Sequence, residues 1–146
     1  MKFYESGDNR KPVIFLFPGT CCLYNSFDHV LDGLHSYFYT VAVSYDGFVN
    51  MFGIDKGGSP WITKQSVYNQ FYSDLVTKVQ HGIDVPGTTI HVFYATKMGK
   101  KYEKRYCTYF KNPDIRRHNM QHEELFCCHS AEWVEEVRKA VEGDRQ

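Results

Sequence analysis

The chain lacks several features that would assign it to a class at once. It has no run of the roughly 18 apolar residues that a membrane-spanning helix needs, and its first residues, MKFYESGD, contain no apolar signal core. Its 17 basic and 17 acidic residues leave no net charge, and no basic stripe is interleaved with aromatic residues. We therefore expect a cytoplasmic protein that binds neither nucleic acid nor a membrane.

Cysteine is present, but not in the patterns that usually mark disulfides or redox sites. The five cysteines include two adjacent pairs, Cys21-Cys22 and Cys127-Cys128, and no C-x-x-C occurs. Adjacent cysteines rarely bridge each other, and an odd total leaves one without a partner. These features favour reduced thiols in a reducing compartment.

The chain does have the material for one aromatic-rich domain. Its 146 residues are 42% hydrophobic and 16% aromatic, which argues against disorder. We expect a single domain over residues 1–146, with an N-terminal half (1–49), a loop and cap-like helix (50–85) and a C-terminal half (86–146). Because zero net charge gives little repulsion between copies, a homodimer is also expected.

The N-terminal half predicts a strand, a helix and a second strand. The apolar run over residues 13–17 is followed by Pro-Gly and is typical of a strand buried on both faces of a parallel sheet. Asn25 or Ser26 can cap the next segment, in which apolar residues recur at helical spacing. Residues 40–44 form the second strand, so the unit implies a right-handed crossover.

The rest of the chain predicts further alternation of helices and strands. A Gly-rich loop is expected over 50–60, and the predicted elements are a helix over 63–79, a strand over 88–95, a helix over 99–110, a strand over 114–119 and a helix over 131–141. This alternation favours an α/β fold. We expect a three-layer α/β/α sandwich with about four mostly parallel strands, in the spatial order second, first, third, fourth.

Two blocks of the chain resemble the α/β-hydrolase family, whose members include esterases and lipases. Residues 11–48 contain the family's first strand, oxyanion turn, helix and next strand, with Pro-Gly in place of the usual His-Gly. Residues 86–143 resemble the strand that delivers the acid, a helix, and the strand before the catalytic histidine. The segment MQHEEL puts His122 in the place of that histidine. The resemblance implies a reduced hydrolase fold that acts on carboxylic esters.

The resemblance also implies roles for individual residues. His122 would be the general base, and Gly19 and Thr20 would form the oxyanion turn, with the Thr20 N–H as one donor. The family's acid is expected after the strand over 88–95, where this chain has Thr-Lys-Met-Gly. Glu103, one helical turn further on, is the nearest substitute.

The nucleophile of the family is missing from this sequence. No G-x-S-x-G occurs between the two blocks, and we interpret this as an internal deletion near residues 49–51. The nearest match places Ser59 before Pro60, which lacks the N–H that an oxyanion donor needs. The first hypothesis is therefore a relative of the ester hydrolases with little or no turnover. Any remaining substrate would be a small ester.

A second hypothesis is a cysteine-dependent hydrolase that uses Cys21 or Cys22 with His122. A thiolate near the start of the first helix would be stabilised by the helix dipole, although buried cysteines are usually structural. A third hypothesis is a non-catalytic binding or homodimeric interaction module. For His122 itself the sequence leaves two interpretations. It is either a solvated side chain beside two glutamates or a residue in the position of the former catalytic base.

A metal site is the remaining alternative at the histidine end of the chain. The candidate ligands crowd into twelve positions and are His118, His122, Cys127, Cys128 and His129. Imidazole and thiolate suit zinc, and a helix over 119–125 would put the first two on one face. However, Glu123 follows the second histidine, so H-E-x-x-H is absent. We expect no metal and no cofactor.

Overall fold

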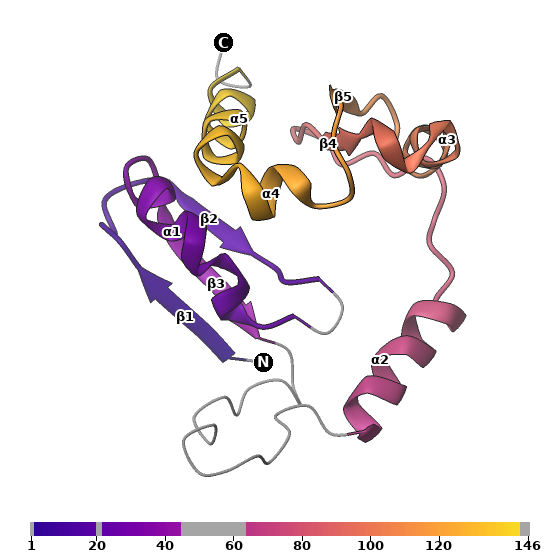
Figure 1. Ribbon diagram of the computed structural model, residues 1–146, viewed down its shortest axis with the longest axis horizontal. Helices are drawn as coiled ribbons and strands as arrows, with labels where there is room; N and C mark the ends of the chain where they lie inside the picture. The colour runs from indigo at the N-terminus through magenta and orange to yellow at the C-terminus, as the bar shows by residue number, and fades with distance from the viewer. Residues whose placement is uncertain (1, 20–21, 45–63, 144–146) are drawn as a thin grey trace. The chain divides into compact units, whose positions relative to one another are not determined.

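The computed structural model describes residues 2–19, 22–44 and 64–143 of the chain (Figure 1). Helices and short strands alternate along them, which confirms the mixed α/β content predicted from the sequence. The chain divides into two compact units, Met1–Thr77 and Lys78–Gln146, each with its own small sheet. Each unit is described by itself below, and the expectation of one domain over 1–146 stays a prediction.

The first unit contains a mixed three-stranded sheet. Its strands are β1 (Lys2–Ser6), β2 (Val13–Leu16) and β3 (Tyr39–Ser44), in the spatial order β1-β3-β2. β2 runs parallel to β3, which confirms the predicted neighbours. β1 pairs antiparallel with β3 and was not expected from the sequence.

The helix between β2 and β3 packs as its apolar spacing predicts. A short 3₁₀ turn, η1 (Tyr24–Phe27), runs into α1 (Asp28–His35). The side chains of Val30 and Leu34 are fully buried at 1% and 0% exposure. The predicted cap is wrong, because the 3₁₀ turn already occupies that position and the Ser26 hydroxyl donates to the carbonyl of Leu23 instead.

The two faces of this sheet have different surroundings. Ser6 and Thr40 lie on one face, where both hydroxyls contact His35 of α1, and β-sheet alternation puts Leu16 on that face too. Phe15 lies on the opposite face and is 56% exposed, as are Val13 and Phe17 to similar extents. The prediction that residues 13–17 are buried on both faces is therefore wrong, because α1 covers only one side of β2.

The second unit is built around a parallel pair of strands. β4 (His91–Ala95) and β5 (Asp114–His118) are joined by the 3₁₀ turn η3 (Thr96–Met98) and α3 (Lys100–Tyr109). α4 (Glu124–Cys128) and α5 (Ser130–Gly143) follow. The helices predicted over 99–110 and 131–141 and the strand over 114–119 are confirmed. The strand predicted over 88–95 begins later, at His91, and α4 was not predicted.

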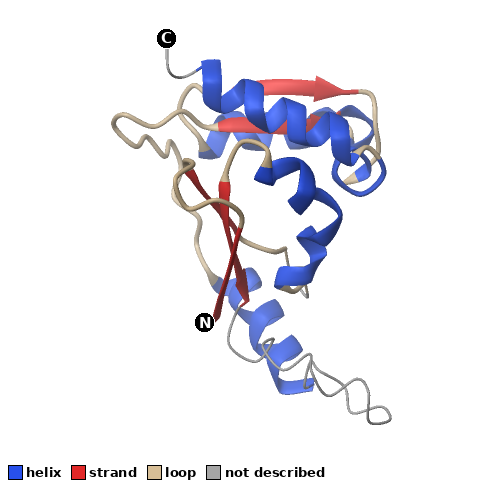
Figure 2. Ribbon diagram, turned by 90° about the vertical axis from the view of Figure 1, so that its left-hand side faces the viewer, coloured by secondary structure: helices blue, strands red, loops and turns tan. Residues whose placement is uncertain are grey.

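Helices cover both faces of this two-stranded sheet (Figure 2). Arg116 lies on one face and bonds Glu136 of α5 across 3.3 Å. Its neighbour Arg117 lies on the other face and forms an ion pair with Glu103 of α3. The alternation of side chains along β5 thus directs two consecutive arginines to two different helices.

The expected single sheet of about four parallel strands differs from what the described residues form, which is a mixed sheet of three strands and a parallel sheet of two. The helix predicted over 63–79 is present as α2 (Lys64–Val76), and its Leu75 side chain is 84% exposed. None of the described helices is long and apolar enough to cross a membrane. The loop predicted over 50–60, including Ser59, and the inferred deletion point lie outside the described residues.

Candidate functional site

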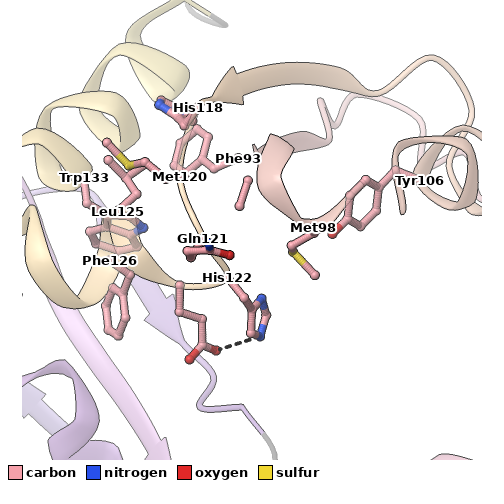
Figure 3. A pocket seen from close by; sticks show the side chains of 12 residues that line it. Phe93, Met98, Tyr106, His118, Met120, Gln121, His122, Leu125, Phe126 and Trp133 are labelled. Atoms are coloured by element: carbon pink, nitrogen blue, oxygen red, sulfur yellow. Dashed lines mark ion pairs between the residues drawn. The ribbon is translucent and has the colours of Figure 1, made fainter. Parts of the chain in front are cut away.

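A cavity of about 190 Å³ lies at the carboxyl ends of β4 and β5 (Figure 3). The segments that follow the two strands form part of its wall, and a hydrogen bond from the Lys97 N–H to the Met120 carbonyl (3.2 Å) joins them. In parallel α/β sheets this edge is where ligands usually bind. The cavity is therefore the candidate site of the second unit.

Most of the cavity wall is apolar and aromatic. The apolar and aromatic residues that line it are Phe93, Ala95, Met98, Tyr106, Met120, Leu125, Phe126 and Trp133. The rings of Phe126 and Trp133 pack edge to face with centroids 5.2 Å apart. The polar lining residues are His118, Gln121, His122 and Glu123. Among the described residues of the wall there is no serine, threonine or cysteine.

His122 lies in the loop after β5, where the sequence predicted it. Its side chain is 70% exposed, and its Nε2 lies 3.7 Å from a carboxylate oxygen of Glu123, which is also largely exposed (Figure 3). An exposed pair of this kind contributes little stability. Because α4 begins only at Glu124, His118 and His122 do not share a helical face, and that part of the zinc hypothesis is wrong.

Local hydrogen bonds hold the loop that carries His122. The backbone N–H of Gln121 donates to the carboxylate of Glu124 at 2.6 Å, and the N–H of Glu124 donates back to the Gln121 carbonyl at 3.2 Å. Between them, Glu123 has a left-handed backbone with φ 59°, which is uncommon for a residue other than glycine. This tight turn keeps both His122 and Glu123 at the cavity.

Glu103, the substitute for the family's acid, has another partner. It accepts a hydrogen bond of 3.0 Å from Nε of Arg117 and a second, shorter one from the same guanidinium. It is not among the residues that line the cavity. The carboxylate beside His122 is therefore that of Glu123, its neighbour in sequence, and not the predicted acid.

The candidates for the oxyanion turn and the thiol belong to the first unit. Gly19 is exposed, and its carbonyl accepts a hydrogen bond of 3.0 Å from the N–H of Cys22, a half-buried residue just before η1. Thr20 and Cys21 lie outside the described residues. His122 belongs to the second unit, so the predicted catalytic groups are distributed over both units.

The histidines and cysteines that crowd together in the sequence spread out in the structure. Cys127 and Cys128 lie exposed on α4, with His129 at its end, whereas His118 ends β5. No group of three or more potential ligands that could hold a metal occurs in the part of the chain that the structure describes.

A serine–histidine contact that sequence reasoning missed occurs in the first unit. Ser6 Oγ lies 3.0 Å from His35 Nε2 and 2.8 Å from Thr40 Oγ1. Nε2 also lies 3.1 Å from Thr40 Oγ1. Gly7, at φ 96°, makes this approach possible, because a Cβ there would lie 2.9 Å from the imidazole of His35. Nothing in the sequence signals the contact, since it depends on the pairing of β1 with β3.

The hydrogen bonds among Ser6, His35 and Thr40 connect β1, α1 and β3, which is a structural role. Thr40 is completely buried, and its hydroxyl also lies within hydrogen-bond reach of the Ser6 carbonyl. A catalytic serine needs an imidazole oriented by a third group, usually a carboxylate. Within the described residues, no carboxylate bonds His35.

A charged network lies at the other end of the second unit's sheet, where its strands begin. Asp114 accepts hydrogen bonds from His91 Nδ1 (2.8 Å) and Arg116 Nε (3.1 Å). The bond from His91 is the main reason why the pKa of Asp114 is lowered, and the bond from Arg116 adds to it. This network stabilises the start of both strands and is not part of the cavity.

The chain has no significant match among protein-family models, curated proteins or solved structures. The resemblance to the α/β-hydrolases therefore rests on the sequence motifs.

Proposed function

We propose that the chain is a reduced relative of the α/β-hydrolases that act on carboxylic esters, and that it retains little or no ester turnover. Two parallel strand–helix–strand units support the relationship, because they follow each other in the order that the resemblance implies. His122 follows the last strand, as the catalytic histidine does in the family.

One observation carries the loss of turnover: the described wall of the cavity beside His122 contains no serine, threonine or cysteine. Nucleophilic catalysis needs a hydroxyl or thiol within hydrogen-bond reach of its base. His122 has Glu123 as its neighbour instead. It is a base with no serine, threonine or cysteine beside it in the described part of the cavity wall.

The proposed fold is a single sheet with the parallel order β3-β2-β4-β5 and β1 at the outer edge. Among the described strands, β2 pairs only with β3, and β4 pairs only with β5. Each has one unpaired edge, and such edges favour pairing with another strand. Disulfide trapping between cysteines introduced at Ile14 and Val92 tests this arrangement, and absence of any cross-link while the chain stays folded would contradict it.

Ester hydrolysis by the purified chain tests the proposed loss of turnover. With 4-nitrophenyl acetate and butyrate as substrates, we expect the rates of the native chain and the His122→Ala variant to agree within about twofold. His129→Ala is the matched control, because His129 is an exposed histidine outside the cavity wall. Turnover that disappears only in His122→Ala would overturn the proposal.

Labelling experiments then identify any nucleophile. We expect no serine to react with a fluorophosphonate and no cysteine to react with iodoacetamide faster than an exposed model thiol. Rapid alkylation of Cys21 or Cys22 that requires His122 would establish the cysteine-dependent hydrolase instead. A phosphonylated Ser6 would turn the contact with His35 into a catalytic pair.

A second candidate function is a self-associating interaction module. The support is a set of four apolar side chains of the first unit, Phe3, Val13, Phe15 and Phe17, each of which is more than half exposed. Exposed apolar side chains of this kind are removed from water when copies associate. Sedimentation of the native chain should show a dimer that Phe15→Lys dissociates, whereas Val85→Lys, a charge at an exposed valine of the second unit, should leave it intact. A monomer at high concentration would contradict this function.

A further inference from the structure

We propose that the exposed side of α3 binds the phosphates of double-stranded nucleic acid without reading its base sequence. The four basic residues of this helix form a basic stripe, which consists of Lys100, Lys101, Lys104 and Arg105. None of them lines the cavity at the carboxyl ends of β4 and β5. The inference therefore goes beyond the proposed loss of ester turnover and does not depend on it.

The basic stripe lies on one side of the helix. Its residues are spaced i, i+1, i+4 and i+5, and successive residues of an α-helix are about 100° apart, so the four fall within a sector of about 140°. All four are exposed, and so is Lys97 in the turn η3 just before the helix. Tyr106 lies on the opposite side of α3, where its ring contacts that of Tyr94 of β4, with centroids 6.0 Å apart. The fold therefore directs these charges outward.

The charges of the basic stripe are not neutralised within the part of the chain that the structure describes. Neither the stripe nor Lys97 forms an ion pair with a carboxylate there, and the acidic residue of α3, Glu103, is paired with Arg117. The basic residues that follow α3 differ, because each contacts a carboxylate; they are Lys111, Arg116, Arg117, Arg138 and Lys139. The zero net charge of the chain, which contributed to the expectation of no nucleic-acid partner, thus conceals a local excess of positive charge.

A nucleic-acid duplex matches the length and the charge density of the basic stripe. The Cα atoms of the stripe span about 7.5 Å along the helix axis, and a duplex carries about four phosphates over the same distance along its own axis. Lysine binds phosphate as a point charge on a flexible stem. Contacts of this kind hold a duplex in place but carry no sequence information.

Two other polyanionic partners fit the stripe less well. A helix that lies in a membrane surface also buries large apolar side chains, and α3 exposes none of its own. An acidic peptide is usually recognised through pockets for its side chains as well as through charge. The described residues that line the hollow on this side of α3 offer no large apolar anchor for such a side chain; they are Lys100, Glu103, Lys104, Cys107 and Thr108.

Fluorescence anisotropy of a labelled random-sequence DNA duplex of about 20 base pairs, titrated with the native chain between about 50 and 200 mM KCl, tests the proposal. We expect saturable binding, with a slope of log K against log salt of about −3.6, which corresponds to four phosphate contacts. Lys100→Gln combined with Lys104→Gln should weaken binding at least about tenfold at the lowest salt and bring the slope to about −1.8.

The matched control is Lys111→Gln combined with Lys139→Gln. It removes the same charge from two exposed lysines that already contact carboxylates, so affinity should change less than about twofold. Circular dichroism checks that both double variants stay folded.

Four results would overturn the proposal. They are the absence of saturable binding at the lowest salt, a slope near zero, an equal loss of affinity in the control variant, and tighter binding to phosphatidylserine vesicles or to a glutamate-rich peptide than to the duplex. Ester turnover is measured separately and depends on other residues. Failure of duplex binding therefore leaves the proposed loss of turnover standing, and turnover by the native chain leaves duplex binding standing.

Discussion

The pair β2–β3 in the first unit and the pair β4–β5 in the second are both parallel and both joined by a helix, but their surroundings differ. β3 is the centre of three strands, and its residues from Thr40 to Ser44 are all buried. Of the strand residues in the second unit, Tyr94 is the only buried residue of β4, and β5 has no buried residue. The first pair is stabilised mainly by apolar burial, whereas the second buries fewer strand residues and also has charged side chains in contact with α3 and α5.

The difference in burial between the two strand pairs indicates which unit has room for a ligand. A close-packed apolar core leaves few voids larger than a water molecule, and burial of α1 against β3 produces such a core. A sheet of only two strands has no central strand, so each strand is an edge, and the space at its carboxyl end is bounded by loops and short helices. The candidate cavity occurs in this unit, whose strands have fewer buried residues.

Leu34→Ala should produce the largest effect, and only in the first unit. Leu34 is completely buried in α1, and removal of its side chain should cost about 3 kcal/mol through lost burial and the remaining void. Amide hydrogen exchange should accelerate roughly a hundredfold in β3 and stay unchanged in β5. Leu75→Ala, at an exposed leucine of α2, is the matched control. Equal acceleration in β5 would show that the two units unfold together.

Arg116→Met should produce a smaller effect in the second unit and one that depends on salt. The change removes the bonds to Asp114 and Glu136 but keeps an unbranched side chain over the sheet. Because these groups are partly exposed, the expected loss is about 1 kcal/mol at low ionic strength and less in 0.5 M salt. Urea unfolding followed by Trp133 fluorescence in a Trp61→Phe background measures it. A loss that salt does not change would indicate packing rather than charge.

Much of the fold could be predicted from the sequence wherever apolar spacing matches the burial it produces. The helical spacing of Phe27, Val30, Leu31, Leu34 and Phe38 predicted a buried helix face, and all of them are buried except Leu31, which is half-buried. The continuous apolar run over 13–17 led to the wrong prediction of a strand buried on both faces. Such a run has the same pattern whether one face of the strand is covered or both. β1 was missed since its pairing with β3 depends on a partner far along the chain.

The candidate site could be predicted only in part. The resemblance located His122 in the loop after β5, and Figure 3 shows it there at the cavity. The cavity itself could not be foreseen, because its wall combines side chains from two strands, three helices and the segments between them. The buried position of His118 Nε2 and the contact of Arg117 with Glu103 depend on the face of β5 that each side chain occupies. Sequence spacing alone does not fix these contacts.

The smallest predicted effect is the acid sensitivity of the second unit. The pKa of Asp114 is lowered from 3.8, chiefly by its bond from His91. A carboxylate whose pKa is lower in the folded state stabilises the fold above its unfolded pKa, and this contribution is lost as the pH falls through the folded value. Since Asp114 is partly exposed, the contribution should be below about 1 kcal/mol.

Asp114→Asn should therefore lower the free energy of unfolding near pH 6 and make no difference well below pH 3.8. Urea unfolding across this range measures the change, with Asp32→Asn on α1 as the control. A loss from Asp114→Asn that is as large in acid as at pH 6 would mean that its carboxyl acts through shape and not through charge.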